Sequence, residues 1–187
     1  MRLIIGITGA SGAIYAKRLL EMLHERGVEI DLIITPYGRY IIEYELGIGV
    51  KEIEKFATRL WDVDDMAADI ASGTQLCDGM VVIPCTMNTV AKMAHGIADN
   101  LLLRAFDVML KSRSRNRGII IVPRETPLNE NHLENLLRLK RMGVTIIPPV
   151  PAFYYHPKSI QDMVDFVVAL ILREFGIAHT VPKWKKP

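Results

Sequence analysis

Residues 4–19, IIGITGASGAIYAKRL, join a short apolar run to a helical pattern through a glycine-rich turn. The apolar run over Leu3–Thr8 predicts a buried strand, and the spacing of apolar residues over Ala13–Arg26 predicts an amphipathic helix. A strand that leads through a tight turn into a helix is the repeating unit of a parallel sheet covered by helices. This stretch therefore predicts an α/β fold.

The rest of the chain repeats this alternation. Further strands are expected at Glu29–Thr35, Gly79–Pro84, Ile119–Val122 and Val144–Ile147. Further helices are expected at Tyr37–Leu46, Asn88–His95, Asn100–Lys111, Glu130–Met142 and Ser159–Phe175. The stretches 60–78 and 146–157 look irregular, and the second reads IIPPVPAFYYHP. With right-handed crossovers, the alternation predicts a three-layer, doubly wound parallel sheet. No repeat or low-complexity linker divides the chain, so we expect one domain over residues 1–187.

Composition and charge exclude several classes of protein. Hydrophobic residues make up 50% of the chain and charged residues 24%, which is typical of a folded protein and not of a disordered one. A net charge of +2 gives no sign of a nucleic-acid partner, and the basic run KSRSRNR at 111–117 contains no aromatic residue. The longest apolar run, Phe166–Leu172, is too short to span a bilayer.

The cysteines and the N-terminal residues bear on the compartment. Cys77 and Cys85 lie outside any CxxC spacing, and no signal-peptide pattern precedes the first strand. No cluster of His and Cys has the spacing of metal ligands, so we expect no metal site. These observations predict a cytoplasmic protein without a membrane segment.

The glycine spacing in the first turn argues against a dinucleotide. From Gly6 to Gly12 the pattern is G-x-x-G-x-x-G, whereas the dinucleotide fingerprint is G-x-G-x-x-G with an acidic residue at the end of the second strand. Here Asp31 lies near the start of that strand, and Thr35 ends it. What the turn retains is the hydroxyl of Ser11 and a helix N-terminus, which favours anions. The alternative is a glycine turn that only packs a helix on a strand.

Two later strands end in residues that suit an anion. The third strand runs into PCTMNTVAKMAHG at 84–96, where Thr86 and Asn88 are good N-cap residues. Another strand runs into VPRETP, where Arg124 suits bidentate capture of phosphate. Ligands of doubly wound sheets bind at the carboxyl ends of the strands, so the pattern favours a mononucleotide site there. Taken singly, these residues are also consistent with plain helix caps and a surface ion pair.

Four motifs together resemble the flavin prenyltransferase (UbiX) family, formerly described as aromatic acid decarboxylases. They are GITGASGAIYAKRLLE at 6–21, PCTMNTVAKMAHGIADNLLLRAFDVMLK at 84–111, VPRETPLNENHLENLLRLKRMGVTIIPPVPAFYYHPKSIQDMVDFVV at 122–168 and KW at 183–184. The resemblance implies a Rossmann-like flavoprotein fold that binds FMN and assembles as a homo-oligomer, commonly a dodecamer. It also implies transfer of a dimethylallyl group from dimethylallyl monophosphate to N5 and C6 of reduced FMN. The product, prenylated FMN, would serve decarboxylases of the UbiD type, and no metal would be required.

The resemblance also implies roles for particular residues. Contacts to FMN are expected from Gly9, Ala10, Ser11, Thr35, Thr86, Met87, Asn88, Thr89 and Arg124. The catalytic residues are expected to be Ser11, Glu45, Lys111, Glu125 and Tyr154. The prenyl phosphate is expected to contact Arg104, Lys111, Arg124, Tyr154 and Arg173. Arg173 is included because Leu170 stands where the family usually has Arg or Lys.

The expected roles of the charged residues agree with the chemistry of prenyl transfer. Breaking an allylic C–O bond leaves negative charge on the phosphate, so fixed cations such as Lys111 and Arg124 would lower the barrier. Lys111 lies seven residues after Arg104, which places both on one face of the expected helix. Glu45 and Ser11 would relay the N5 proton, and Glu125 would orient the phosphate or accept the C6 proton.

Two other functions stay open at this point. FMN-dependent cysteine decarboxylases share the pattern N-T-x-A-K-x-A-x-G-x-A-D-N-L, but they use a histidine before the third strand. This chain has no histidine between Leu46 and Met80, which favours prenyl transfer. A non-catalytic flavin carrier would explain the glycine turn, but it would leave the expected catalytic residues without a reason.

Overall fold

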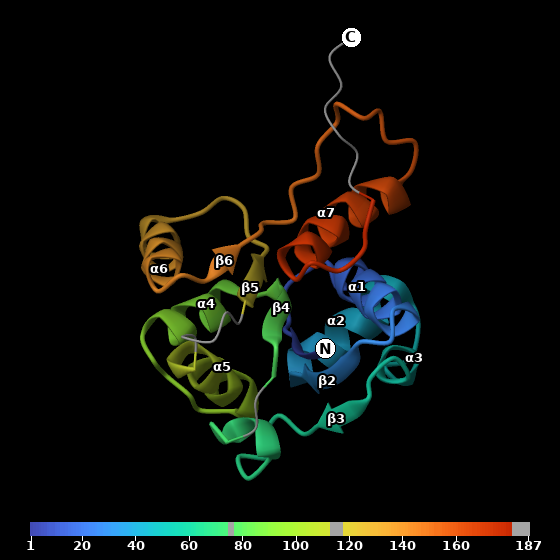
Figure 1. Ribbon diagram of the computed structural model, residues 1–187. Coiled ribbons are helices and arrows are strands. Elements are labelled where there is room, and N and C mark those ends of the chain that lie inside the picture. The colour runs from blue at the N-terminus through green and yellow to red at the C-terminus, as the bar shows by residue number, and fades with distance from the viewer. Residues whose placement is uncertain (75–76, 113–117, 181–187) are drawn as a thin grey trace.

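The computed structural model describes residues 1–74, 77–112 and 118–180. Most of the basic run at 111–117 and the KW pair at 183–184 lie outside these ranges. Within them, parallel strands form a 6-stranded sheet in the order β3-β2-β1-β4-β5-β6 (Figure 1). The strands are β1 Arg2–Ile7, β2 Glu29–Ile34, β3 Arg59–Trp61, β4 Gly79–Cys85, β5 Gly118–Pro123 and β6 Thr145–Ile146. This is the strand order of doubly wound nucleotide-binding sheets, the class of sheet that the sequence predicts.

Helices cover both faces of the sheet. One face packs against α1 Ala13–Glu25, α2 Pro36–Leu46, α3 Lys51–Glu54 and α7 Ile160–Glu174. The other packs against the 3-10 helix η1 Asp69–Ala71, α4 Met87–Ala94, α5 Leu101–Lys111 and α6 Glu130–Arg141. Every helix within the described ranges falls short of the length and apolarity that a membrane span requires. The three-layer arrangement predicted from the alternation is therefore confirmed.

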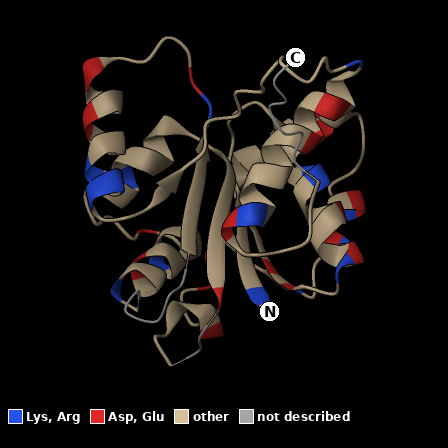
Figure 2. Ribbon diagram, turned by 45° about the horizontal axis from the view of Figure 1, so that its top comes forward, with Lys and Arg blue, Asp and Glu red and all other residues tan. Residues whose placement is uncertain are grey.

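The sheet is buried on both faces because its strands are apolar at nearly every position. Side chains alternate along a strand, so Ile4 packs under α4 and α5, while Leu3 and Ile5 pack under α1 and α7. Figure 2 shows Lys, Arg, Asp and Glu intermixed on the outer sides of the helices, with the central strands mostly uncharged. Burial of these two apolar layers is the main source of stability, at about 25 cal/mol for each Å² removed from water.

The expected elements agree with the observed ones to within about two residues at each end. The differences are short elements in segments without a clear pattern: α3, β3 and η1. Strand β3 has only 3 residues, two of them exposed, at the edge of the sheet. Such a strand has no buried face to impose an alternating pattern, so its residues give no period to detect.

Asp31 shows why a dinucleotide was a poor fit. This carboxylate is 0% exposed and accepts hydrogen bonds from Arg2 Nε at 2.5 Å and from Trp61 Nε1 at 2.8 Å. A buried charge is tolerated only when it is paired and hydrogen-bonded. Asp31, the third residue of β2, is thus committed to holding β1, β2 and β3 together.

The strand order reverses between β1 and β4, which brings their carboxyl ends together. The Thr8 hydroxyl donates to the carbonyl oxygen of Pro84 at 2.7 Å, and the N–H of Thr86 donates to Thr8 Oγ1 at 2.9 Å. Gly38 lets α2 approach the same edge, because a Cβ there would lie 2.6 Å from the carbonyl oxygen of Ile7. In doubly wound sheets this reversal is where a ligand binds.

Candidate active site

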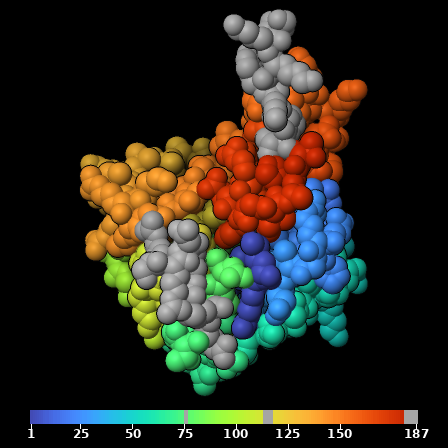
Figure 3. Space-filling model, in the orientation of Figure 1, coloured from blue at the N-terminus to red at the C-terminus, as the bar shows by residue number. Residues whose placement is uncertain are grey.

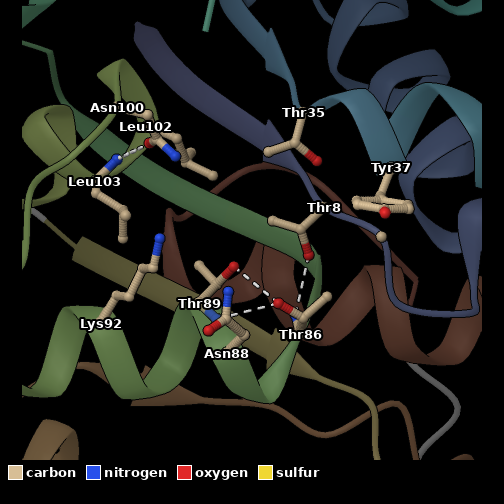
Figure 4. A pocket seen from close by; sticks show the side chains of 11 residues that line it. Thr8, Thr35, Tyr37, Thr86, Asn88, Thr89, Lys92, Asn100, Leu102 and Leu103 are labelled. Carbon is tan, nitrogen blue, oxygen red and sulfur yellow. Dashed lines mark hydrogen bonds between the residues drawn. The ribbon is translucent and has the colours of Figure 1, made fainter. Parts of the chain in front are cut away.

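A pocket of about 370 Å³ lies at the carboxyl ends of β1 and β4 (Figure 4). It is built from four segments that are far apart in the sequence. The β1–α1 turn gives Thr8 and Gly9; the start of α2 gives Thr35 and Tyr37; α4 gives Thr86, Asn88, Thr89 and Lys92; the start of α5 gives Asn100, Leu102 and Leu103. The volume lies within the range of small-molecule sites.

Three helices begin at the wall of this pocket. Thr35 caps α2 by accepting from the N–H of Gly38 at 3.1 Å, Thr86 caps α4 by accepting from Thr89 at 3.1 Å, and Asn100 caps α5 by accepting from Leu103 at 3.0 Å. Each helix start carries a partial positive charge and N–H groups without intrahelical acceptors. Their convergence makes the pocket suited to an anion.

The threonines form a hydrogen-bonded cluster within the pocket. Thr86 Oγ1 and Thr89 Oγ1 are 2.9 Å apart, and Thr86 is tied to Thr8 through its backbone N–H (Figure 4). Opposite them, Gly9 must be a glycine because a Cβ there would lie 2.5 Å from the Cβ of Tyr37. Hydroxyl donors on one wall and an aromatic ring on the other suit a ligand with a phosphate and a flat apolar part, which FMN has.

Glu45, near the end of α2, reaches the start of α1 at Gly12, three residues after Gly9 of the pocket lining. Its Oε2 accepts hydrogen bonds from the N–H groups of Gly12 and Ala13, both at 2.9 Å. Partial burial favours a higher pKa, but the hydrogen bond from Ser11, these backbone donors and the positive charge of Arg124 together hold the pKa of Glu45 below its ordinary value. At neutral pH Glu45 is therefore a carboxylate that can accept a proton through Ser11.

Arg124 and Glu125 follow β5 directly. The backbone N–H of Arg124 donates to the carbonyl oxygen of Cys85 at 3.2 Å, which fixes this segment beside the end of β4. The guanidinium is exposed and close enough to Glu45 to lower its pKa. Glu125 is also exposed and accepts from the N–H of Thr126 at 3.0 Å. Glu45 therefore lies close to both Ser11 and Arg124 of the same chain. From the sequence, these three residues could be grouped only by resemblance.

Two of the residues expected to contact FMN are buried. Ala10 is 6% exposed and Met87 is 7% exposed, and the Met87 side chain packs in the core beneath α4. Any contact that Met87 makes with a ligand would therefore use its backbone N–H, which lies in the first turn of α4.

Arg104 and Lys111 do not line the pocket of their own chain. Arg104 Nε donates to the carbonyl oxygen of Ala71 at 3.1 Å and its Nη1 pairs with Asp107 at 2.7 Å. Lys111 lies against Gly73, where a Cβ would be 3.3 Å from Lys111 Cε. Arg104 and Lys111 therefore lie on the same face of α5, the one beside residues 71–73. Their spacing of seven residues predicts this shared face. At 1.5 Å per residue, Lys111 is about 15 Å along the axis from the start of α5.

Tyr154 and Arg173 lie elsewhere in the chain. Tyr154 packs edge-on against Tyr155, with ring centroids 5.9 Å apart, and against Phe166 at 6.2 Å. Its segment extends away from the sheet between β6 and α7 (Figure 1). Arg173 is exposed on the last turn of α7, close to Phe175, which packs over the amino ends of β4 and β5. In one chain, neither residue lines the pocket.

Several lining residues were not among the residues expected to contact a ligand. They are Thr8, Tyr37, Lys92, Asn100, Leu102 and Leu103. Lys92 follows Thr89 by three positions, which puts both residues on one side of a helix. This spacing could have identified Lys92 as a neighbour of Thr89 in the pocket. Asn100 carried the signal of an N-cap residue before an apolar helix. Thr8 and Tyr37 required knowledge of which strand ends meet.

Comparison with known proteins gives the family. The Flavoprotein family model matches residues 1–172. The chain is 47% identical over 177 residues to a probable UbiX-like flavin prenyltransferase of Bacillus subtilis (strain 168), and the match covers 95% of this chain and 85% of the relative.

Solved structures agree with this relationship. A dodecameric FMN-dependent Ubix-like decarboxylase from Escherichia coli O157:H7 superposes with a TM-score of 0.95 at 43% identity, covering 100% of both chains. AnUbiX (PadA1), solved in complex with FMN and dimethylallyl pyrophosphate, gives a TM-score of 0.95 at 38% identity, covering 99% of this chain and 97% of its own. The FMN-dependent cysteine decarboxylase SpaF, at 24% identity and a TM-score of 0.63, shares the fold alone. The chain belongs to the flavin prenyltransferase (UbiX) family of flavoproteins.

Proposed function

We propose that this protein binds FMN and transfers a dimethylallyl group from dimethylallyl monophosphate to N5 and C6 of the reduced flavin. The observation that carries the proposal is the Glu45 carboxylate, held with Ser11 at the start of α1 beside an anion-binding pocket. The relatives named flavin prenyltransferase support the same reaction.

The pocket would hold FMN through groups that are already in place. Thr35, Thr86 and Thr89 offer hydroxyls, and the first turns of α2 and α4 offer N–H donors to the phosphate. Gly9, Ala10 and Asn88 would contact the ribityl chain or ring, and Met87 would contribute its backbone. Reduced FMN supplies the nucleophilic N5 and C6 that accept the prenyl group.

Residues beside the pocket would move protons and stabilise charge. Glu45, ionised at neutral pH, would accept through Ser11 the proton that N5 loses when it is alkylated. Arg124 would bind the phosphate that departs from the prenyl donor, where a fixed cation offsets the developing negative charge. Glu125, next to Arg124, would orient that phosphate or accept the proton that C6 loses, while the prenyl double bond takes up a proton as its tertiary carbon joins C6.

We assign Arg104, Lys111, Tyr154 and Arg173 to the prenyl-phosphate contacts of a neighbouring copy. Two observations support this. These residues are not part of the pocket lining in their own chain, and a relative that covers the whole chain is described as dodecameric. We therefore propose a homo-oligomer, most simply a dodecamer, whose active sites combine residues from more than one copy.

Residues 1–187 would form one FMN-binding domain, since the described strands form a single sheet. Cys77 and Cys85 are both buried, and we propose that the protein acts in the reducing cytoplasm. Prenylated FMN would be delivered to a UbiD-type decarboxylase.

The test is anaerobic mixing of the protein, reduced FMN and dimethylallyl monophosphate, followed by mass spectrometry of the flavin. We expect a flavin heavier by one five-carbon unit, formed only when all three components are present. A parallel reaction with dimethylallyl diphosphate identifies the preferred donor. If the protein binds FMN and forms no adduct with either donor, it is a flavin carrier and the enzymatic proposal is wrong.

A further inference from the structure

Lys92 occupies a distinctive place in the pocket. It rises from the second turn of α4 toward the start of α5 (Figure 4). Among the described residues that line the pocket, it is the only one with a formal charge. No expectation from the sequence gave it a role.

Its surroundings consist of groups that favour an anion. Lys92 shares one side of α4 with Thr86 and Thr89, whose hydroxyls are 2.9 Å apart. The capped starts of α2, α4 and α5 face the same space. No Asp or Glu is among the described lining residues. An ammonium group beside hydroxyls and helix N-termini is a common arrangement for binding a phosphate.

The lysine is held in position by an acidic residue outside the pocket. Lys92 Nζ lies 2.5 Å from Asp99 Oδ2, in the loop between α4 and α5. Their side chains are 30% and 49% exposed, respectively. Exposed pairs of this kind contribute little to stability, so a phosphate dianion can share or replace Asp99 as the partner of the ammonium. The pair orients Lys92 at the pocket until a phosphate competes with Asp99 for the ammonium.

We propose that Lys92 binds the phosphate of FMN and makes the pocket select the phosphorylated flavin over riboflavin. This inference rests on the proposed function, because it takes FMN as the ligand of the pocket. It adds the residue that determines which flavin is accepted.

The experiment compares the dissociation constants of FMN and riboflavin for the full oligomeric protein, measured by quenching of flavin fluorescence. In Lys92→Met we expect FMN affinity to fall about tenfold to a hundredfold, as for loss of a hydrogen bond to a charged group, while riboflavin affinity changes by less than about twofold. Lys92→Arg should retain most of the preference for FMN, because it keeps the charge.

Two further variants separate binding from structure. Lys55→Met removes another lysine paired with an acid, Glu52 at 2.6 Å, outside the described lining of the pocket, and should leave both affinities unchanged. Asp99→Asn breaks the Lys92 pair but leaves the ammonium, so FMN should bind at least as tightly as to the wild type. Circular dichroism and melting temperatures establish that each variant is folded.

The outcomes are distinct. Equal loss of FMN and riboflavin affinity in Lys92→Met, or an Asp99→Asn variant that matches Lys92→Met, would overturn the inference and give the pair a structural role. An unchanged preference for FMN in Lys92→Met would also overturn it. If the wild-type protein binds neither flavin, the proposed function itself is wrong; if it binds FMN and forms the prenyl adduct, only the role of Lys92 is at issue.

Discussion

Glu45 is the residue whose local geometry argues most directly for chemistry. Its carboxylate is held by the N–H groups of Gly12 and Ala13, and no side-chain cation of the residues that the structure describes lies within salt-bridge distance of it. In Glu45→Gln we expect prenyl transfer to slow by about a hundredfold or more, because a general base contributes that much, while the FMN dissociation constant stays within about twofold. Single-turnover formation of the adduct and flavin fluorescence measure the two quantities.

The matched control for this variant is Glu43→Gln. Glu43 is exposed on the same helix, two residues before Glu45. It should show neither effect. A loss of FMN binding in Glu45→Gln as large as the loss of turnover would remove the catalytic role assigned to Glu45.

The lowered pKa of Glu45 also predicts a pH dependence of stability. Its pKa lies below the ordinary 4.5 in the folded protein, so the unfolded chain binds the proton more tightly. The stabilisation is fully present above about pH 4.5 and is lost as the pH falls through the lower, folded value. The difference in melting temperature between wild type and Glu45→Gln should therefore be largest near neutral pH and shrink below pH 4.5. A difference that stays constant down to acidic pH would contradict this linkage.

At the scale of elements, the cap of α4 has two duties. Thr86 holds the first turn of α4 and also lines the pocket. Ser159 caps α7 in the same way, by accepting from the N–H of Asp162 at 3.1 Å, outside the described lining of the pocket. We expect Thr86→Ala and Ser159→Ala each to cost about 1 kcal/mol of unfolding free energy.

Only Thr86→Ala should weaken FMN binding, by about tenfold, because it alone removes a hydroxyl from the pocket. Urea denaturation gives the stabilities, and fluorescence titration gives the affinities. Equal FMN affinities in the two variants would mean that Thr86 is only a helix cap.

The elements themselves could be predicted because burial imposes a pattern on the sequence. Both faces of β1 and β4 are covered, so their residues read as apolar runs, and the helix caps Thr86, Asn100 and Ser159 mark the starts of helices. The edge strand β3 lacks such a constraint and was missed. Secondary structure was therefore predictable where an apolar run or a helix cap marks the element, as it does for the edge strand β6, and not in the short, mostly exposed strand β3.

The site was predictable only in part, for a related reason. The glycine turn and the α4 cap lie at adjacent strand ends, and the strand order of a doubly wound sheet brings them together. Lys92 lies farther along α4 and is neither a cap nor a strand end, so its only signal in the sequence is its spacing of three residues from Thr89. That the side of α4 shared by these two residues faces the pocket follows from how α5 packs beside α4, which is tertiary information.

A single chain leaves several large apolar side chains exposed to solvent. The segment between β6 and α7 stands out from the body (Figure 3), and Val150 and Phe153 on it are 71% and 66% exposed. Tyr37, Tyr40 and Tyr44 are exposed along α2, and Tyr37 also lines the pocket. Exposed apolar groups in such number mark interaction surfaces. They agree with an oligomer in which the cations of one copy approach the pocket of another.

Complementation between inactive variants tests this arrangement. Chains carrying Glu45→Gln and chains carrying Lys111→Ala should each be inactive alone, since each lacks one residue of every site. If Glu45 and Lys111 of one site come from different copies, co-assembly of the two variants in equal amounts leaves about a quarter of the sites with both residues intact. Anaerobic prenyl transfer by the mixed oligomer should recover to about that fraction of wild-type activity. The control pairs Glu45→Gln with Ser11→Ala: Ser11 hydrogen-bonds Glu45 within one chain, so no mixed site regains both, and activity should stay at the level of the separate variants. Recovery in the control, or none in the Glu45 and Lys111 mixture, would show that the site is not shared between copies in this way.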